Sequence, residues 1–417
     1  MRYDLVIIGA GLAGMSAALA AVKMNKQAVV LSKGLGSLYS SSGYIDLLGY
    51  YPTTEMKPVL NPARALDVLV EEKPDHPYSL VGKEAIREAF TDFLSISREI
   101  GLAYSGTLDE NILMPTAAGA LIPTCLYPET TGKKITEAPV ITVVGIEELA
   151  DFYPDYAADN LRHRLKGEVK SVWASLNIKV KRELNSFDIA LALENFHVQE
   201  ALIKELENKV PRNSLIVIPA VLGVQNWQQV TKTIEKALNC DVLEVPTLPP
   251  SVMGYRLAEK LQQHLKHKGV DFITGHPVTH VKCSGRQRLE VGISLGSGKL
   301  KKIQGDSFVL ATGGILNEGL LACPGSIKES VFDLPIVNDL LHVDRDFFSL
   351  KAQGLSLAGV AVNSNMQPID IKSGQTIYEN LRAAGATLAG YDPFIEKSGN
   401  GVALASGYKA GKLAIGA

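Results

Sequence analysis

The sequence is poor in cysteine, and its few cysteines are far apart. Its 417 residues contain only Cys125, Cys240, Cys283 and Cys323. Zinc sites and iron–sulfur clusters are usually built from cysteines separated by about two to four residues. The spacing therefore predicts no metal site and no disulfide framework. Four scattered thiols are typical of a reducing cytosol.

Net charge, aromatic residues and long apolar runs are also scarce. The formal net charge is -2 and aromatic residues make up 6% of the chain, so we expect no nucleic-acid partner, because such proteins need basic patches and stacking surfaces. No stretch approaches the roughly 20 apolar residues that span a bilayer. Any work at a membrane would then depend on a partner.

The first 32 residues read as a strand, a helix and a second strand. Residues 3–8 and 27–32 are short apolar runs of the kind found in buried parallel strands, and residues 12–23 have helical spacing. A β-α-β unit of this kind predicts an α/β fold, Rossmann-like and of the FAD/NAD(P)-binding type. A chain of this length exceeds one hydrophobic core, which predicts a second α/β domain inserted in the first.

The turn between the first strand and the helix carries three spaced glycines. In such a turn Gly9 allows the sharp bend, Gly11 lets a phosphate approach the backbone, and Gly14 lets the helix pack on the strand. Leu12 and Ala13 begin the helix, whose free N–H groups attract an anion. This context, a strand before and a helix after, predicts a nucleotide site.

The end of the second strand departs from the usual pattern. Dinucleotide folds commonly place Asp or Glu there to bind a ribose hydroxyl, whereas this chain has Ser32 and Lys33. A serine can still bond a ribose and a lysine can meet a phosphate. The usual adenosine contact is weakened, which leaves FMN and FAD both open as cofactors.

Two further segments have the small residues that close contact with a ligand requires. Ser41, Ser42 and Gly43 form a serine-rich loop whose backbone N–H groups could approach a planar ring, with a flexible loop as the alternative. A buried strand over residues 307–311 runs into Thr312-Gly313-Gly314, which suits close packing of backbone against a nucleotide; a plain strand and turn is the alternative there.

The remaining pattern divides the chain. We expect the nucleotide-binding domain from residues 1–104 and 251–417, and the inserted α/β domain from 105–250. The expected elements are strands at 140–144, 187–193 and 215–218, helices at 154–165, 197–208, 227–238 and 252–268, and an antiparallel group at 270–273, 278–283 and 289–295.

The order of these segments resembles flavoproteins of the fumarate reductase and succinate dehydrogenase type. A closer resemblance, from end to end, is to the B subunits of the bacterial anaerobic glycerol-3-phosphate dehydrogenases. It rests on the glycine turn and on five stretches: Ser41-Ser42-Gly43-Tyr44-Ile45-Asp46-Leu47-Leu48, His76-Pro77-Tyr78-Ser79-Leu80, Leu248-Pro249-Pro250-Ser251-Val252-Met253-Gly254-Tyr255-Arg256-Leu257, Gly374-Gln375-Thr376 and Gly390-Tyr391-Asp392-Pro393.

The resemblance implies a flavoprotein with FMN, or alternatively FAD, in a peripheral membrane complex. Its partners would be a second flavin subunit and an iron–sulfur membrane-anchoring subunit. The complex would oxidise sn-glycerol 3-phosphate to dihydroxyacetone phosphate in glycerol metabolism. Electrons would pass through a partner to the quinone pool of anaerobic respiration. The expected location is the cytoplasm, or the cytoplasmic face of the inner membrane through a partner.

The C-terminal segment is expected to complete the flavin site. A glycine-rich turn entering a helix faces the N1/C2 carbonyl region of many flavins, where charge builds up on reduction. We expect contacts from Gly385, Gly401, Val402 and Ala403. Asp392 could contact the ribityl chain, with an Asp-Pro turn as the alternative.

No catalytic base can be named from the sequence. Arg256 is a weak candidate for an anion contact, because the prolines before it place it near a helix start; a surface arginine is equally compatible. One hypothesis is that this subunit relays electrons from a companion that oxidises the substrate. Two other interpretations are a free-standing flavin dehydrogenase or reductase of another small acid or polyol, and a scaffold that has lost its cofactor.

Overall fold

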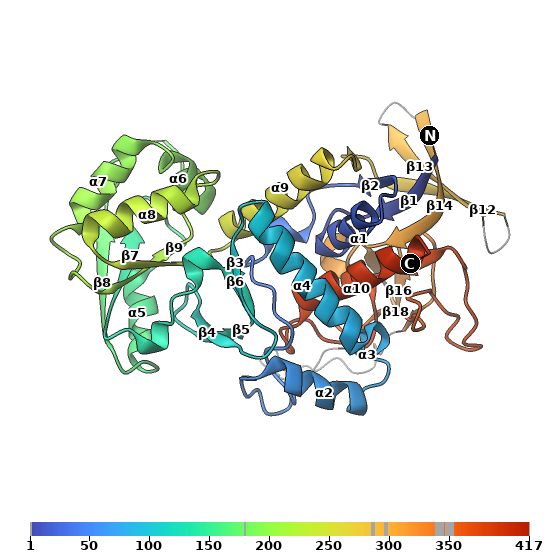
Figure 1. Ribbon diagram of the computed structural model, residues 1–417, viewed down its shortest axis with the longest axis horizontal. Coiled ribbons are helices and arrows are strands. Elements are labelled where there is room, and N and C mark those ends of the chain that lie inside the picture. The colour runs from blue at the N-terminus through green and yellow to red at the C-terminus, as the bar shows by residue number, and fades with distance from the viewer. Residues whose placement is uncertain are drawn as a thin grey trace. The chain divides into compact units, whose positions relative to one another are not determined.

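The chain forms two compact units in a computed structural model that describes residues 2–178, 181–284, 288–295, 299–337, 346 and 354–416. The first unit contains Met1–Ser37, Asp46–Ile100 and Lys260–Ala417, and the second contains Leu38–Ile45 and Gly101–Glu259. Figure 1 shows both, coloured along the chain. The limits expected from the sequence, 104/105 and 250/251, lie four and nine residues from the limits at 100/101 and 259/260.

Leu38–Ile45 groups with the second unit because its backbone bonds to residues there. The Tyr104 hydroxyl donates to the Gly43 carbonyl, and the Ser251 amide donates to the Tyr39 carbonyl over 2.9 Å. The sequence pattern places this segment in the first domain instead, since such long-range bonds leave no local pattern.

The first unit is built on a seven-stranded sheet. Its order is β11-β2-β1-β14-β13-β12, with β19 also paired to β14. The part formed by β11, β2, β1, β14 and β19 is parallel, and β12 and β13 continue it in antiparallel pairing. The strands are β1 (Arg2–Ile8), β2 (Ala28–Ser32), β11 (Asp271–Thr274), β12 (Val278–Ser284), β13 (Arg288–Leu295), β14 (Lys299–Leu310) and β19 (Leu381–Ala383).

One strand assignment from the sequence is wrong. The pattern groups residues 270–273 with the antiparallel strands that follow, but β11 pairs in parallel with β2 at the edge of the sheet. Its true partner is distant in sequence, and periodicity alone does not indicate which strand lies beside it.

Helices cover the sheet of the first unit. Helix α1 packs against α10, which in turn contacts α3 and α4 (Figure 1). The helices are α1 (Leu12–Lys23), α2 (Pro62–Glu72), α3 (Pro77–Val81), α4 (Lys83–Glu99) and α10 (Gly399–Ala414); α9 (Val252–His267) contains the limit between the units. The short strands are β15 (Leu320–Cys323), β16 (Ser326–Glu329), β17 (Ile336–Val337) and β18 (Gly359–Val360).

The second unit has a parallel sheet of its own, in the order β10-β9-β7-β8. Its strands are β7 (Val140–Ile146), β8 (Glu168–Ala174), β9 (Leu215–Pro219) and β10 (Asp241–Val245). Two antiparallel pairs accompany this sheet, β3 (Tyr104–Gly106) with β6 (Leu126–Pro128) and β4 (Ile112–Pro115) with β5 (Leu121–Thr124). Its helices are α5 (Pro154–Arg162), α6 (Ser186–Ala192), α7 (Phe196–Leu206) and α8 (Trp227–Leu238).

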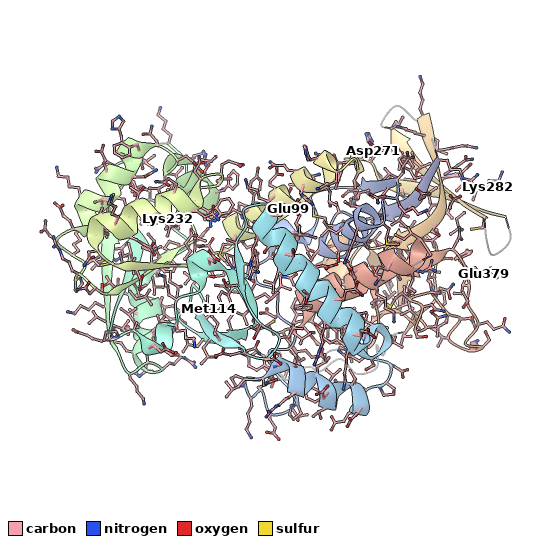
Figure 2. All side chains as sticks on the ribbon, viewed as in Figure 1. Glu99, Met114, Lys232, Asp271, Lys282 and Glu379 are labelled. Carbon is pink, nitrogen blue, oxygen red and sulfur yellow. The ribbon has the colours of Figure 1, made fainter. Side chains whose placement is uncertain are left out.

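Helix α8 illustrates how these helices are placed. Val230, Ile234 and Leu238 are buried along one stripe, while Lys232 points to solvent (Figure 2). That alternation at a spacing of three to four residues is typical of an amphipathic helix lying on a sheet. It matches the helix expected from the sequence over 227–238.

The expectation of a strand over 187–193 is wrong, because this segment forms α6. The Asn185 side chain accepts a hydrogen bond from the Asp188 amide over 3.0 Å, and the Asp188 side chain accepts one from the Asn185 amide over 3.1 Å. This reciprocal cap stabilises a helix start. A seven-residue segment with six apolar residues fits either element, and here the cap decides.

Candidate functional site

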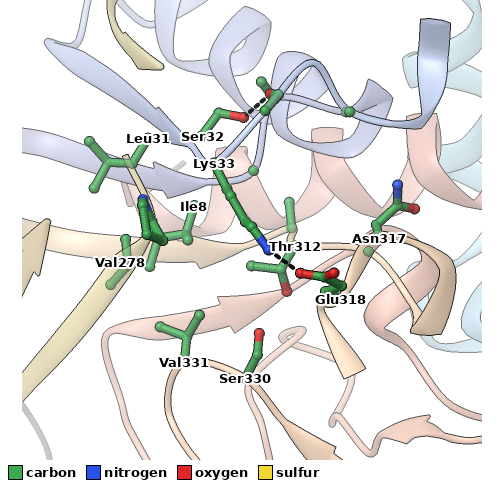
Figure 3. A pocket seen from close by; sticks show the side chains of 18 of the residues that line it. Ile8, Leu31, Ser32, Lys33, Val278, Thr312, Asn317, Glu318, Ser330 and Val331 are labelled. Carbon is green, nitrogen blue, oxygen red and sulfur yellow. Dashed lines mark hydrogen bonds and ion pairs between the residues drawn. The ribbon is translucent and has the colours of Figure 1, made fainter. Parts of the chain in front are cut away.

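A pocket opens in the first unit where β1, β2 and β14 end (Figure 3). Its volume is about 540 Å³. Carboxyl ends of parallel strands at a change of strand order are where open α/β sheets bind ligands. It is lined by Ile8, Gly9, Ala10, Gly11, Leu31, Ser32, Lys33, Gly34, Gly36, Ser37, His276, Pro277, Val278, Ala311, Thr312, Gly313, Leu316, Asn317, Glu318, Leu321, Ser330 and Val331.

The glycine turn after β1 forms one wall. Gly9 has a φ of 120°, and a Cβ there would lie 2.0 Å from the Ala311 carbonyl oxygen. At Gly11, in contrast, a Cβ would meet no atom of the described chain within 4 Å. The protein itself therefore requires glycine at position 9, whereas at position 11 glycine leaves open the space that a phosphate would take.

The N-terminus of α1 follows this turn. Its first helical hydrogen bond runs from the Met15 amide to the Gly11 carbonyl over 3.0 Å. The amides of Leu12, Ala13 and Gly14 therefore have no acceptor within the helix. No side chain of the residues that the structure describes caps this helix end. The arrangement suits a phosphate, which would accept from these amides and meet the positive end of the helix dipole.

Thr312, at the end of β14, offers a second polar contact. Its hydroxyl is buried and has no hydrogen-bond partner among the described residues. The next residue is fixed, because the Gly313 amide donates to the Thr387 hydroxyl over 3.2 Å. Gly314 then begins the turn that leads to η4 (Ile315–Asn317). A buried hydroxyl without a partner is costly unless a ligand or water satisfies it, so the lining fits a nucleotide.

At the end of β2, Ser32 and Lys33 bond to other residues of the pocket. The Ser32 hydroxyl donates to the Gly34 carbonyl, and the Lys33 ammonium pairs with the Glu318 carboxylate from the opposite wall (Figure 3). The side chains of Lys33 and Glu318 stay largely exposed, at 64% and 60%. Both predicted residues therefore lie in the pocket, and the charges of the ion pair are open to solvent.

The predicted C-terminal contacts lie close to the glycine turn. A Cβ at Gly385 would lie 2.7 Å from Ala13 Cβ and 3.9 Å from Ala403 Cβ. The Gly385 amide donates to the Ser406 hydroxyl over 2.9 Å. The structure thus brings together three segments that are distant in sequence, with Val402 fully buried beside them.

Gly401 and Asp392 belong to the same C-terminal region but do not line the pocket. A Cβ at Gly401 would lie 2.3 Å from the Tyr78 hydroxyl. The Asp392 carboxylate accepts from the amides of Phe394 and Ile395, over 2.9 and 3.1 Å, and from the Ser356 hydroxyl. These bonds fit the Asp-Pro turn that the sequence left open. A contact of Asp392 with a ribityl chain stays a prediction.

Ser41, Ser42 and Gly43 lie in the second unit, unlike the other predicted cofactor contacts. The Ser41 hydroxyl donates to the Leu38 carbonyl over 2.9 Å. A Cβ at Gly43 would lie 3.0 Å from Met253 Cβ. The loop is therefore held by contacts within that unit, and its role toward a cofactor stays a prediction.

Arg256 is also in the second unit, where its side chain is 4% exposed. It donates to both carboxylate oxygens of Glu244, over 2.6 and 3.0 Å, and twice to the Gly223 carbonyl, over 2.9 and 2.6 Å. Because the Arg256 guanidinium is already bonded to protein groups, the structure does not support it as a contact for a substrate phosphate.

The sequence missed several residues of the pocket. Glu318 lies four residues after the Thr-Gly-Gly stretch, and this proximity is the sequence feature that could have indicated it as a site residue. His276 lies between the expected strands at 270–273 and 278–283, where nothing in the sequence marks it as a site residue. Its Nδ1 donates to the Ser294 carbonyl over 3.0 Å, because a carbonyl can only accept. Lys33, His276 and Glu318 are the titratable side chains among the described residues of the lining.

The described part of the chain offers neither a metal cluster nor a membrane helix. No group of three or more His, Cys, Asp or Glu side chains in it could hold a metal ion. No helix there has the length and apolar character needed to cross a bilayer.

Comparison with known proteins places the chain in a family. A family model described as FAD binding domain matches residues 4–402. The anaerobic glycerol-3-phosphate dehydrogenase B subunit from Aliivibrio fischeri (strain MJ11) is 31% identical over 100% of this chain and 96% of its own. The protein of the same name from Pasteurella multocida (strain Pm70) is 31% identical over 97% of both chains. The chain belongs to the FAD binding domain family and to the family of anaerobic glycerol-3-phosphate dehydrogenase B subunits.

Membership in the B subunit family confirms the resemblance inferred from the motifs. It also confirms the fold class, an α/β flavoprotein fold. A flavin cofactor is supported, but FMN as the first choice is not, because the matching model is that of a FAD binding domain. Among solved structures, the open conformation of a flavocytochrome c3 fumarate reductase matches 99% of this chain and 78% of that chain, at 11% identity and a TM-score of 0.45.

Proposed function

We propose that this chain is a flavin subunit of an anaerobic glycerol-3-phosphate dehydrogenase and that it holds FAD. The observation that carries the proposal is the pocket at the ends of β1, β2 and β14, in a chain related over its full length to B subunits of that enzyme. The open space at Gly11 and the unpaired Thr312 hydroxyl fit a nucleotide.

Residues of the first unit would hold the cofactor. The amides of Leu12, Ala13 and Gly14 would donate to the phosphates. Thr312 would donate its hydroxyl, and Leu316, which is 82% exposed and lines the pocket, would gain an apolar contact. When bound, a flavin supplies a hydride acceptor for the oxidation of an alcohol to a ketone.

The reaction proposed is oxidation of sn-glycerol 3-phosphate to dihydroxyacetone phosphate. The alcohol carbon would lose a hydride and the alcohol oxygen a proton, which needs a base. His276 lines the pocket, but its amide donates to the Ser32 carbonyl over 3.3 Å, at the strand end where a dinucleotide ribose lies, so it is not assigned as that base. The base is unassigned on this chain.

The proposed setting is a complex at the cytoplasmic face of the inner membrane. A second flavin subunit and an iron–sulfur membrane-anchoring subunit would be the partners, and quinone would receive the electrons through them. The support is the designation of the relatives as one subunit of a larger enzyme. Purification of the chain from its native host with or without copurifying subunits tests this part.

Rapid mixing of the flavin-loaded chain with glycerol 3-phosphate tests the reaction. Bleaching of the flavin within one turnover supports oxidation on this subunit. If bleaching requires the second flavin subunit, this chain is an electron relay, and the proposal that it oxidises the substrate is wrong. A chain that never binds flavin would contradict the proposed function as a whole.

A further inference from the structure

The end of β2 lacks the carboxylate that commonly binds a ribose in this fold. Its last residue is Ser32, and the Ser32 hydroxyl donates its proton to the Gly34 carbonyl. Lys33, which follows, is a cation and cannot accept a hydrogen bond from a hydroxyl group. A ribose in this pocket would therefore find no acceptor of the usual kind on β2.

A carboxylate reaches the same place from the opposite wall. Glu318 lies in the loop after β14, and its side chain points across the pocket to Lys33 (Figure 3). Among the described residues of the lining, Glu318 carries the one carboxylate. Because the side chain is 60% exposed, a ligand can reach it without displacing packed protein.

The backbone at Glu318 is held in an unusual conformation. Its φ is 57°, in the left-handed region. The Glu318 amide donates to the Ile315 carbonyl over 3.1 Å, and the Gly319 amide donates to the Gly314 carbonyl over 3.1 Å. A Cβ at position 319 would lie 2.1 Å from the Gly313 carbonyl oxygen, so the loop has little freedom to relax.

A glutamate in that conformation is unfavourable, because glycine or asparagine adopts it more easily. At position 318 this conformation ends η4, and nine other non-glycine residues of the described chain share it, so it fixes the direction of the side chain and does not by itself indicate a ligand. The observation that indicates a ligand is the open position of the carboxylate in the pocket, beside Lys33.

We propose that Glu318 binds the adenosine ribose of FAD in place of the missing acid on β2. One carboxylate can accept from the two neighbouring ribose hydroxyls, and both hydrogen bonds would be charge-assisted. The Lys33–Glu318 ion pair would be exchanged in part for these bonds. This inference rests on the proposed function, namely that the pocket holds FAD.

Nucleotide binding to the cofactor-free chain tests the inference without any activity measurement. The probes are ADP and 2′,3′-dideoxyadenosine 5′-diphosphate, which lacks both ribose hydroxyls. We expect the chain to prefer ADP by roughly tenfold to a hundredfold, as for hydrogen bonds to a charged group. Glu318→Gln should lose most of that preference, and the exposed Glu71→Gln should keep it.

Glu318→Asn separates binding from folding, because asparagine tolerates a positive φ. We expect this variant to be as stable as the parent or more so, while its affinity for ADP and FAD falls. If Glu318→Asn and Glu318→Gln both bind ADP like the parent, the inference is overturned and the flavin site stands. The inference is also overturned, with the flavin site standing, if the parent binds ADP and 2′,3′-dideoxyadenosine 5′-diphosphate equally well, or binds FMN but not ADP. A parent that binds neither FAD, FMN nor ADP overturns the proposed function itself.

Discussion

Two ion pairs show how differently the two units use charge. In the second unit, Arg256 and Glu244 are 4% and 0% exposed, and Arg256 also bonds the Gly223 carbonyl. In the first unit, Lys33 and Glu318 are 64% and 60% exposed at the wall of the pocket. The buried pair is committed to folding, whereas the exposed pair can exchange water for a ligand.

Two buried threonine hydroxyls extend the comparison. Thr142 in the second unit and Thr312 in the first both lack a partner among the described residues. Thr142 lies inside β7 and is 0% exposed, while Thr312 lines the pocket. The same chemical group is thus enclosed by protein in one unit and placed toward a ligand in the other.

The largest effect is expected from Arg256→Met. Removal of one partner leaves the Glu244 charge buried and unpaired, which costs about 3–5 kcal/mol. Hydrogen exchange at β9 and β10 should report the loss. Arg182→Met is the control, because it removes an exposed partner of Asp188. It should change hydrogen exchange in β9 and β10 little. Equal protection in the parent and in Arg256→Met would mean that the buried pair does not stabilise this unit.

Gly9→Ala and Gly11→Ala should separate folding from binding within the glycine turn. At Gly9 the positive φ and the contact with Ala311 predict a loss of about 1–3 kcal/mol from backbone strain alone. At Gly11 the φ is -75° and space is open, so stability should fall by less than about 1 kcal/mol. The affinity of Gly11→Ala for FAD should nevertheless fall. Flavin titration measures this affinity, and thermal unfolding measures the stability of both variants. A Gly11→Ala variant with unchanged affinity would argue against a phosphate at this turn.

Thr312→Val should weaken FAD binding roughly threefold to tenfold, the value of one neutral hydrogen bond. The cofactor-free protein should not lose stability, because the hydroxyl has no partner to lose among the described residues. Thr142→Val is the matched control, and its affinity for FAD should equal that of the parent. If Thr312→Val and Thr142→Val bind FAD with the same affinity, the Thr312 hydroxyl does not contact the cofactor.

The smallest effect concerns pH and the cap of α6. Hydrogen bonds from Arg182 lower the pKa of the Asp188 carboxyl from 3.8 to about 2. Because the folded pKa lies below the unfolded one, the stabilisation is present above the unfolded pKa and is lost as pH falls through about 2. The stability difference between the parent and Asp188→Asn should therefore narrow on acidification, as urea midpoints would show. A difference that is constant with pH would rule out a charged Asp188 as its source.

Local patterns predicted the parts of the fold that are formed locally. The unit of β1, α1 and β2 follows from two apolar runs and a helical stretch with glycines between them, and the pocket lies at its turn. Two features that the sequence missed depend on long-range pairing. β11 joins β2 from far along the chain, and Glu318 reaches Lys33 through a loop that no periodicity describes.

The candidate site was predicted in the same uneven way. The predicted residues that line the pocket each end or follow a strand whose carboxyl end meets the same edge of the sheet; they are Gly9, Gly11, Ser32, Lys33, Thr312 and Gly313. Asp392 and Arg256 instead bond within the protein. The residue type shows what a side chain can bind, but only the fold determines whether another protein group binds it first.

The most direct test is to identify what the purified chain carries. Heat release followed by chromatography should give FAD in a one-to-one ratio with the chain, and the cofactor-free chain should rebind it. Purified Gly11→Ala should carry less FAD per chain than the parent. A chain that purifies without flavin and does not take up FAD would contradict the claim that the pocket at the ends of β1, β2 and β14 is a flavin site.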